Sequence, residues 1–178
     1  MHSDLDPGTK KDGYHLYTMP ESDFEMNVAV IKQNDSTYDK FRFIATGDWK
    51  ESPYYEYTDV IGLGWTDNFT LYDDYSYILR PDGADYNATS RNDIDGEAGV
   101  AHDVNLQVGK TDSEVVLVAD VRKHNSSGTM NVKAEYGHVI YTFSDVSVSF
   151  GAPPSIGMSV GWGSDIEKAV PDYEYVSY

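Results

Sequence analysis

The stretch SEVVLVADVRK, residues 113–123, decides the fold that the sequence predicts. Apolar residues occupy every second position from Val115 to Val121, as in a β-strand, and Val116 and Val118 make the centre of the opposite face apolar as well. A solvent-facing strand would alternate between apolar and polar residues, so this one is expected to be covered on both faces. We therefore predict an interior strand of a layered all-β domain.

The chain on both sides of this stretch carries the same period-two pattern. The runs 100–108, 129–135 and 139–150 alternate and are joined to it by short turns, one of them a tight turn at Tyr136-Gly137 in which glycine supplies a positive φ. These runs predict a meander of consecutive antiparallel strands. Further strands are expected upstream, at 14–19, 24–32, 41–46, 59–65 and 71–79.

The pattern as a whole predicts one all-β domain. No run supports a helix of three turns, and residues 165–169 allow at most one short helical turn. We expect a single-domain antiparallel β-sandwich, jelly-roll-like, over residues 14–178, preceded by a flexible lead-in at 1–13. A flattened β-barrel is the alternative closure. The length of 178 residues suits one domain.

Composition limits the classes of partner. The chain has 30 Asp and Glu against 13 Lys and Arg, a net charge of −17, and so would repel nucleic acid. No apolar run approaches the roughly 20 residues of a membrane-spanning helix. Because the chain contains no cysteine, disulfides, thiolate metal sites and cysteine nucleophiles are excluded.

Residues 80–98 contain turn signals and hardly any aliphatic side chain, which predicts one long loop. Calcium takes six to eight oxygen ligands, often from carboxylates and amide carbonyls of flexible loops. An EF-hand register fails, because its first and twelfth positions would be Arg91 and His102. A different Ca²⁺ site is one interpretation of the loop, and a merely solvated acidic loop is the other. The candidate ligands are Asp82, Asp85, Asn92, Asp93, Asp95 and Glu97.

Aromatic residues supply a second candidate site. Exposed aromatic rings can stack on sugar rings, but the same residues could equally form the packing of the sandwich itself. In the run 59–65, Gly62 and Gly64 fall on one face, which indicates an aromatic side chain packed close over them or, alternatively, a ligand groove. The candidate ligand-binding residues are Trp49, Tyr55, Tyr57, Trp65 and Tyr75, from a larger set that includes Tyr54, Tyr72 and Tyr77.

Catalytic chemistry has little support in the sequence. The spacing HExxH and a phosphate-binding glycine loop are missing, and the run GMSVGWG at 157–163, although it contains the letters GxSxG, lacks the helix that a nucleophile elbow or a phosphate loop needs. Glycan hydrolysis needs two acids across a cleft, and a chain with 30 acids offers many pairs without singling one out. No catalytic residue is therefore assigned, and an enzyme is the less favoured interpretation.

Three stretches, IGLGWTDNFTLYDDY (61–75), SRNDIDGEAGVAHDVNLQVG (90–109) and AEYGHVIYTFSDVSVSFG (134–151), resemble uncharacterised secreted all-β proteins of Bacillus-type Gram-positive bacteria. The resemblance implies export and no residue role. Residues 1–13 lack the apolar core of a signal peptide, so the chain is either cytoplasmic or, as we expect, a mature extracellular form whose signal peptide has been removed. The expected function is a secreted, non-catalytic module that binds a glycan or cell-envelope component. A small extracellular glycan hydrolase or lyase with paired carboxylates is the alternative.

Overall fold

The computed structural model describes residues 15–33, 39–51, 53, 57–66, 68–106, 114–141, 146–160 and 164–178. The predicted lead-in at 1–13 lies outside these ranges.

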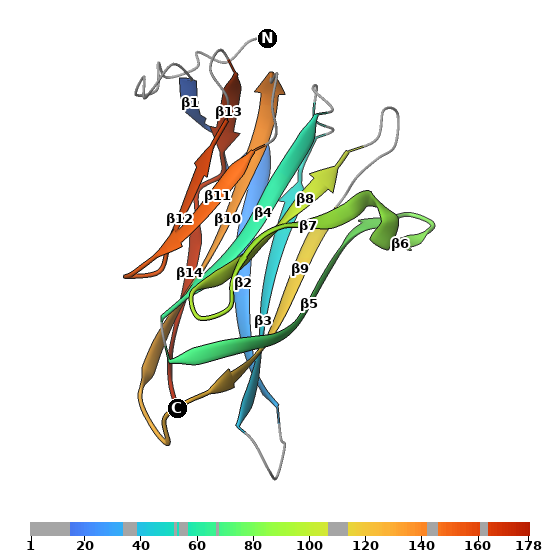
Figure 1. The fold of residues 1–178 in the computed structure, drawn as a ribbon. Coiled ribbons are helices and arrows are strands. Elements are labelled where there is room, and N and C mark those ends of the chain that lie inside the picture. The colour runs from blue at the N-terminus through green and yellow to red at the C-terminus, as the bar shows by residue number, and fades with distance from the viewer. Residues whose placement is uncertain are drawn as a thin grey trace.

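The described residues form a succession of β-strands with one short 3-10 helix (Figure 1). The elements are β1 (His15–Thr18), β2 (Phe24–Gln33), β3 (Lys40–Trp49), β4 (Thr58–Trp65), β5 (Phe69–Arg80), β6 (Gly83–Asp85), η1 (Tyr86–Ala88), β7 (Thr89–Asp95), β8 (Gly99–Asn105), β9 (Glu114–Lys123), β10 (Thr129–Tyr141), β11 (Ser147–Gly151), β12 (Ser155–Ser159), β13 (Asp165–Lys168) and β14 (Asp172–Ser177).

Two large sheets pack against each other. One has five strands in the order β2-β3-β9-β5-β6, and the other has seven, in the order β1-β13-β10-β4-β8-β7 with β14 also paired to β10. Neighbouring strands are antiparallel except for β1 and β13, which run parallel. The sheets stay separate rather than forming one closed sheet. The predicted all-β sandwich is confirmed.

Strand β9 occupies the centre of the five-stranded sheet, as predicted. Val115, Leu117 and Val121 are fully buried in the core between the two sheets. On the outer face Val116 and Val118 are only 4% and 3% exposed, and their cross-strand neighbours on β3 and β5 flank them. The second apolar face of β9 is thus buried by side chains of its own sheet.

The predicted meander is wrong. Strand β8 lies between β4 and β7 in the seven-stranded sheet, β9 lies between β3 and β5 in the other, and β10 returns beside β4. The consecutive strands β8, β9 and β10 therefore alternate between the two sheets. Period-two patterns show which face of each strand is buried but not which strand it pairs with, so they could not exclude this crossing.

The tight turn predicted at Tyr136-Gly137 is also wrong, because β10 continues through both residues. Gly137 pairs with Val60 on one side and Lys168 on the other. A Cβ on Gly137 would lie 2.7 Å from Cδ1 of Ile166. Glycine is needed here for space in a crowded strand rather than for a positive φ.

Two further predictions of local structure are corrected. Residues 80–98 are not one long loop, since they contain β6, η1 and β7. Strand β7 has polar residues on both faces because it is the edge strand of its sheet, and so its sequence lacked a strand pattern. The helical turn expected at 165–169 is instead strand β13.

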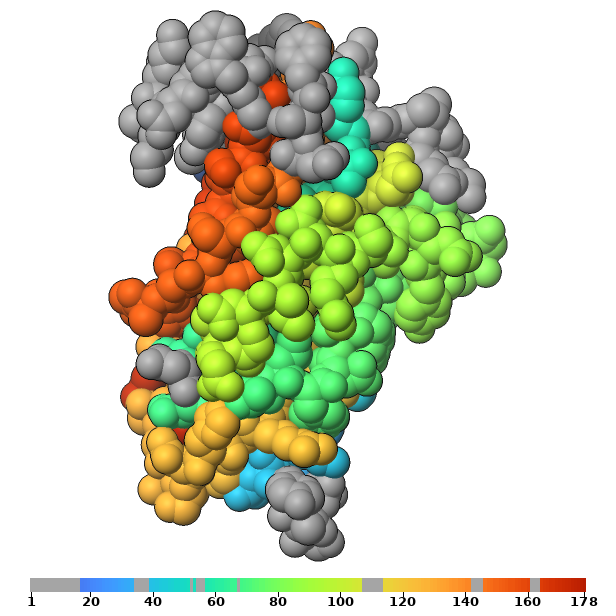
Figure 2. Space-filling model, in the orientation of Figure 1, coloured from blue at the N-terminus to red at the C-terminus, as the bar shows by residue number. Residues whose placement is uncertain are grey.

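The β11–β12 hairpin forms a third layer on the outer face of the seven-stranded sheet, in front of β10 and β4 (Figure 1). It encloses a second apolar cluster, and Figure 2 shows it in orange beside the yellow-green β7. The close packing predicted over Gly62 and Gly64 is present, but the covering side chain is Ile156 rather than an aromatic one. An aromatic ring, that of Phe150, covers Gly99 instead.

Among the described residues, no helix has the length and apolar character needed to cross a membrane.

Candidate functional site

The outer face of the five-stranded sheet carries a strip of tyrosines along β5. We call Tyr72, Tyr75, Tyr77 and Tyr86 the tyrosine face. Tyr75 and Tyr77 are half-buried and alternate with the buried core residues Ser76 and Ile78. Side chains two residues apart on one face of a strand are about 6.8 Å apart. The rings of this strand therefore follow one another along a single line.

The two ends of the strip are placed by local irregularities. Tyr72 stands at the bulge between Leu71 and Asp73 and is 39% exposed. Tyr86 belongs to η1, is 56% exposed, and its ring centroid lies 5.1 Å from that of Tyr77. The Asp85 side chain accepts a hydrogen bond from the Asn87 amide and fixes the start of this helical turn.

The tyrosine face is supported by the central strand of its sheet, and its tyrosines carry hydroxyl groups that can form hydrogen bonds. Tyr75 and Tyr77 are the cross-strand neighbours of Val118 and Val116 on the central strand β9. Burial raises the pKa of both Tyr72 and Tyr77. Their hydroxyls therefore stay protonated at neutral pH and can both donate and accept hydrogen bonds.

Cationic groups gather at the Tyr72 end. Cζ of Arg122 lies 4.7 Å from the Tyr72 ring centroid, and Nζ of Lys40 lies 5.4 Å from it. The Tyr72 hydroxyl donates to Oε1 of Gln33 over 3.3 Å. Beside them Arg42 binds Asp120 through two hydrogen bonds of 2.8 Å. Arginine and lysine near an aromatic ring are attracted to its face, so both cations favour this position of the Tyr72 ring.

A chain of polar side chains joins the two sheets through the core. The Ser76 hydroxyl lies 2.6 Å from Nδ1 of His102, whose Nε2 lies 2.7 Å from Oδ1 of Asp74, and Arg91 also binds Asp74. Burial lowers the pKa of His102, although the hydrogen bond and charge of Asp74 act in the opposite direction. The residue types match a serine–histidine–aspartate triad, but Ser76 is only 4% exposed. With its hydroxyl enclosed in the core, the arrangement serves to hold the sheets together.

A second buried polar group lies at the other end of the core. Asp59 is fully buried and accepts hydrogen bonds from the Tyr136 hydroxyl at 2.6 Å and the Val139 amide at 2.8 Å. Its carboxylate also contacts Nδ1 of His138 at 2.9 Å. Burial opposes protonation of His138, but the adjacent Asp59 outweighs it and raises the pKa.

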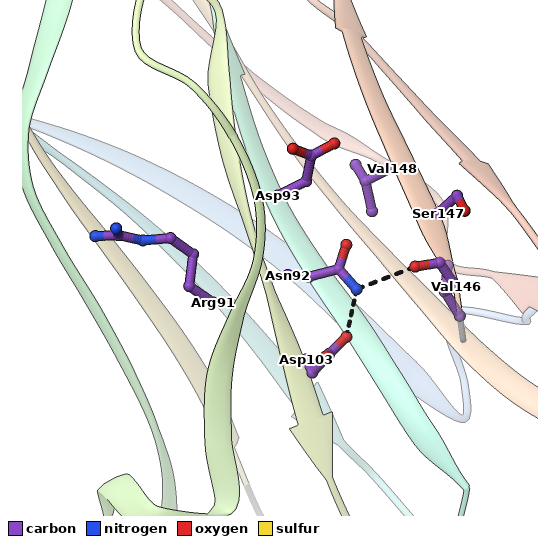
Figure 3. Close-up of a pocket in the computed structure, with 7 residues that line it drawn as sticks. All are labelled: Arg91, Asn92, Asp93, Asp103, Val146, Ser147 and Val148. Carbon is purple, nitrogen blue, oxygen red and sulfur yellow. Dashed lines mark hydrogen bonds between the residues drawn. The ribbon is translucent and has the colours of Figure 1, made fainter. Parts of the chain in front are cut away.

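The pocket in Figure 3 lies between β7, β8 and the start of β11 and has a volume of about 360 Å³. The bulge between Arg91 and Asp93 places Asn92 and Asp93 on the pocket side of β7, while Arg91 extends to the other side. Nδ2 of Asn92 donates to Asp103 at 2.6 Å and to the Val146 carbonyl at 3.0 Å. Asn92 thus ties the third layer to the sheet beneath it.

The structure distributes the predicted calcium ligands over three places. Asp82 and Asp85 lie at the β5–β6 turn beside Arg80, whose Nη1 is 3.0 Å from Asp85. Two more, Asn92 and Asp93, line the pocket of Figure 3, and the last pair, Asp95 and Glu97, lies at the β7–β8 turn. Within the described ranges no three His, Asp or Glu side chains converge on a metal-sized site. The calcium site stays a prediction.

The predicted aromatic ligands also separate. Trp49 and Trp65 are 8% and 1% exposed and pack in the core. Tyr57 is half-buried against the second apolar cluster, and Tyr55 lies outside the described residues. Of the five, Tyr75 lies on the tyrosine face. The spacing of Tyr75 and Tyr77 in the sequence already signalled a shared face, whereas Tyr86 carried no signal because its segment was expected to be a loop.

Comparison with known proteins gives little further guidance. No protein-family model matches the chain, and no curated protein matches it. Among solved structures, the chain is similar to one described as "AvmM Catalyzes Macrocyclization in Alchivemycin A Biosynthesis", with 11% sequence identity and a TM-score of 0.37. The match covers 96% of this chain and 93% of that one. At this level of likeness, no functional conclusion follows.

Proposed function

We propose that the protein is a non-catalytic binding module that holds a glycan on the tyrosine face. The observation that carries the proposal is the line of Tyr75, Tyr77 and Tyr86 on the open face of a sheet. Flat rings with a polar hydroxyl suit sugars, whose apolar ring faces stack on aromatics while their hydroxyls form hydrogen bonds. A secreted or cell-surface location would give such a face access to extended polysaccharides.

A rigid support favours this use of the face. The tyrosines stand on β5 and η1, and β5 pairs along most of its length with the central strand β9. Because the face exists before the ligand arrives, little ordering free energy is lost on binding. An extended polymer could cover several of the rings at once, which a small molecule could not.

The test is a titration of soluble polysaccharides and defined oligosaccharides by isothermal calorimetry, after a glycan-array screen. Tyr75→Ala and Tyr86→Ala should each weaken binding by about 3- to 10-fold, the loss expected for one aromatic stacking contact. Tyr175→Ala is the matched control, since Tyr175 is 62% exposed on β14, in the other sheet. Equal loss in the control, or no binding to any glycan, would refute the proposal. Release of shortened glycan products would favour the hydrolase alternative.

A further inference from the structure

Three charged side chains meet on the outer face of the seven-stranded sheet, away from the tyrosine face. Lys133 and Glu135 alternate along β10 with residues of the main core, so both side chains point outward. Nζ of Lys133 lies 2.9 Å from Oε2 of Glu135. Nζ of Lys168, on the neighbouring strand β13, contacts Oε1 of the same carboxylate. One carboxylate is thus shared by two lysines.

The shared carboxylate is deeply buried. Glu135 is only 2% exposed, and its partner on β4 is Gly62, over which Ile156 of the β11–β12 hairpin packs. Charges in such surroundings are poorly solvated, and one carboxylate neutralises only one of the two ammonium groups. Loss of a proton from one of the lysines would remove the excess positive charge of the cluster.

The two lysines differ in which form their surroundings favour. Nζ of Lys133 lies 5.5 Å from the ring centroid of Tyr173, and the face of an aromatic ring stabilises the charged form of an amine. Burial lowers the pKa of Lys168 to about 8, and the positive charge of Lys133 acts in the same direction. The Lys168 side chain is also the more accessible, with 21% exposed against 13% for Lys133. Lys168 is therefore the lysine that loses its proton more readily and can still be reached by a small molecule.

We infer that Lys168 is a covalent binding site for small aldehydes. A neutral amine is nucleophilic, and lysines that serve as nucleophiles are activated by burial or by a neighbouring cation. The lone pair of Nζ attacks the carbonyl carbon, and both hydrogens of the neutral amine then leave with the carbonyl oxygen as one water molecule while the C=N bond forms. Nothing is oxidised or reduced in this condensation.

The other two members of the cluster have roles in the same reaction. Glu135 can carry a proton from the attacking nitrogen to the carbonyl oxygen, because its carboxylate already contacts Nζ of Lys168. The Lys133 ammonium, on the other side of that carboxylate, can stabilise the negative charge that develops on the oxygen. The inference concerns a different sheet from the tyrosine face and does not depend on glycan binding.

The experiment treats the intact protein with benzaldehyde and cyanoborohydride, which reduces each imine to a stable secondary amine, and locates the modified lysines by peptide mass spectrometry. The internal control is Lys32, whose side chain is 56% exposed and would react first if exposure alone decided. With a pKa of about 8, Lys168 is about one-quarter neutral at pH 7.5, against about 0.1% for an ordinary lysine. Because its lower exposure and basicity offset part of this gain, Lys168 should be modified about tenfold faster than Lys32.

Variants and pH distinguish the cluster from a chance reaction at the surface. Lys133→Gln removes the neighbouring cation and should slow modification of Lys168 about threefold, whereas Lys32→Gln, the matched control, should leave that rate unchanged. In the wild type the ratio of the Lys168 rate to the Lys32 rate should fall above pH 8, as ordinary lysines also lose their protons. Melting temperatures show whether the variants are folded. Equal rates at Lys168 and Lys32, a ratio that does not change with pH, or an unchanged Lys168 rate in folded Lys133→Gln would each overturn the inference.

Discussion

The third layer fits closely on the seven-stranded sheet because glycines in that sheet leave room for its side chains, and Gly99→Ala tests this requirement. A Cβ at position 99 would lie 2.2 Å from Cδ1 of Phe150 and 2.7 Å from the backbone oxygen of Leu63. The Phe150 ring could turn away, but the oxygen belongs to the paired strand β4 and cannot. We therefore expect the substitution to push the hairpin outward and to strain the β4–β8 pairing.

Overpacking a buried site typically costs about 1–3 kcal/mol, and the backbone contact places this variant at about 3 kcal/mol. For a domain of this length each kcal/mol lowers the melting temperature by about 2–4 °C, so a fall of about 6–12 °C is expected. Urea unfolding monitored by tryptophan fluorescence gives the free energy, and calorimetry gives the melting temperature.

Gly96→Ala is the matched control. A Cβ at position 96 has no heavy atom within 4 Å, so this variant should change the free energy of unfolding by less than about 0.5 kcal/mol. The double variant Gly99→Ala/Phe150→Ala should be more stable than the sum of the two single losses predicts, because the ring contact is then already gone. If Gly99→Ala and Gly96→Ala have the same melting temperature, the close fit of the hairpin is refuted.

Four further predictions concern the polar groups of the core and the open face. Asp59→Asn should lower the free energy of unfolding by about 3 kcal/mol, since it removes a fully buried charge that faces His138; a loss below about 1 kcal/mol in urea unfolding would contradict this. In an NMR titration His138 should keep its ring proton to higher pH than His102, whose pKa is lowered; the reverse order would show that Asp59 does not outweigh burial. The pKa of His138 in the folded protein lies above its usual value of 6.5, so protonated His138 stabilises the fold below pH 6.5 and this contribution is lost as the pH rises through the folded pKa. His138→Gln should therefore make the free energy of unfolding fall less steeply over that pH range. Tyr86→Ser should leave the free energy of unfolding within about 0.5 kcal/mol of wild type, because the side chain is 56% exposed; a larger loss would mean that Tyr86 serves the fold rather than a ligand.

The sequence predicted those parts of the fold that depend on which side of a strand is buried. The alternation from Val115 to Val121 located the central strand, and Gly62 and Gly64 indicated a closely covered sheet face. Which strand pairs with which was not predictable in this way, because the apolar face of any strand fits either sheet equally well. The two-layer crossing of β8, β9 and β10 is therefore a property of tertiary packing.

The candidate site was predicted only in part, for two physical reasons. Strand β7 and the turn at Tyr86 lie at the edges of their sheets, so their side chains follow no apolar period. Trp65 shows the second reason: an aromatic residue has the same sequence signal in a core as on a binding face, and its 1% exposure is set by neighbours distant in sequence. Only their spacing on one strand distinguished Tyr75 and Tyr77 from the aromatic residues of the core.

The long strand β10 has a consequence for the order in which the protein can form. One edge of β10 pairs with β4, but the other edge pairs first with β14 and then with β13, which are synthesised after it. Strand β1, near the start of the chain, pairs in turn with β13. While a ribosome adds about 5–20 residues per second, that side of the sheet must wait for residues 165–177 to emerge. The seven-stranded sheet can thereby be completed only after β13 and β14 have been synthesised, and until then the nascent chain presents an open strand edge that a chaperone could engage.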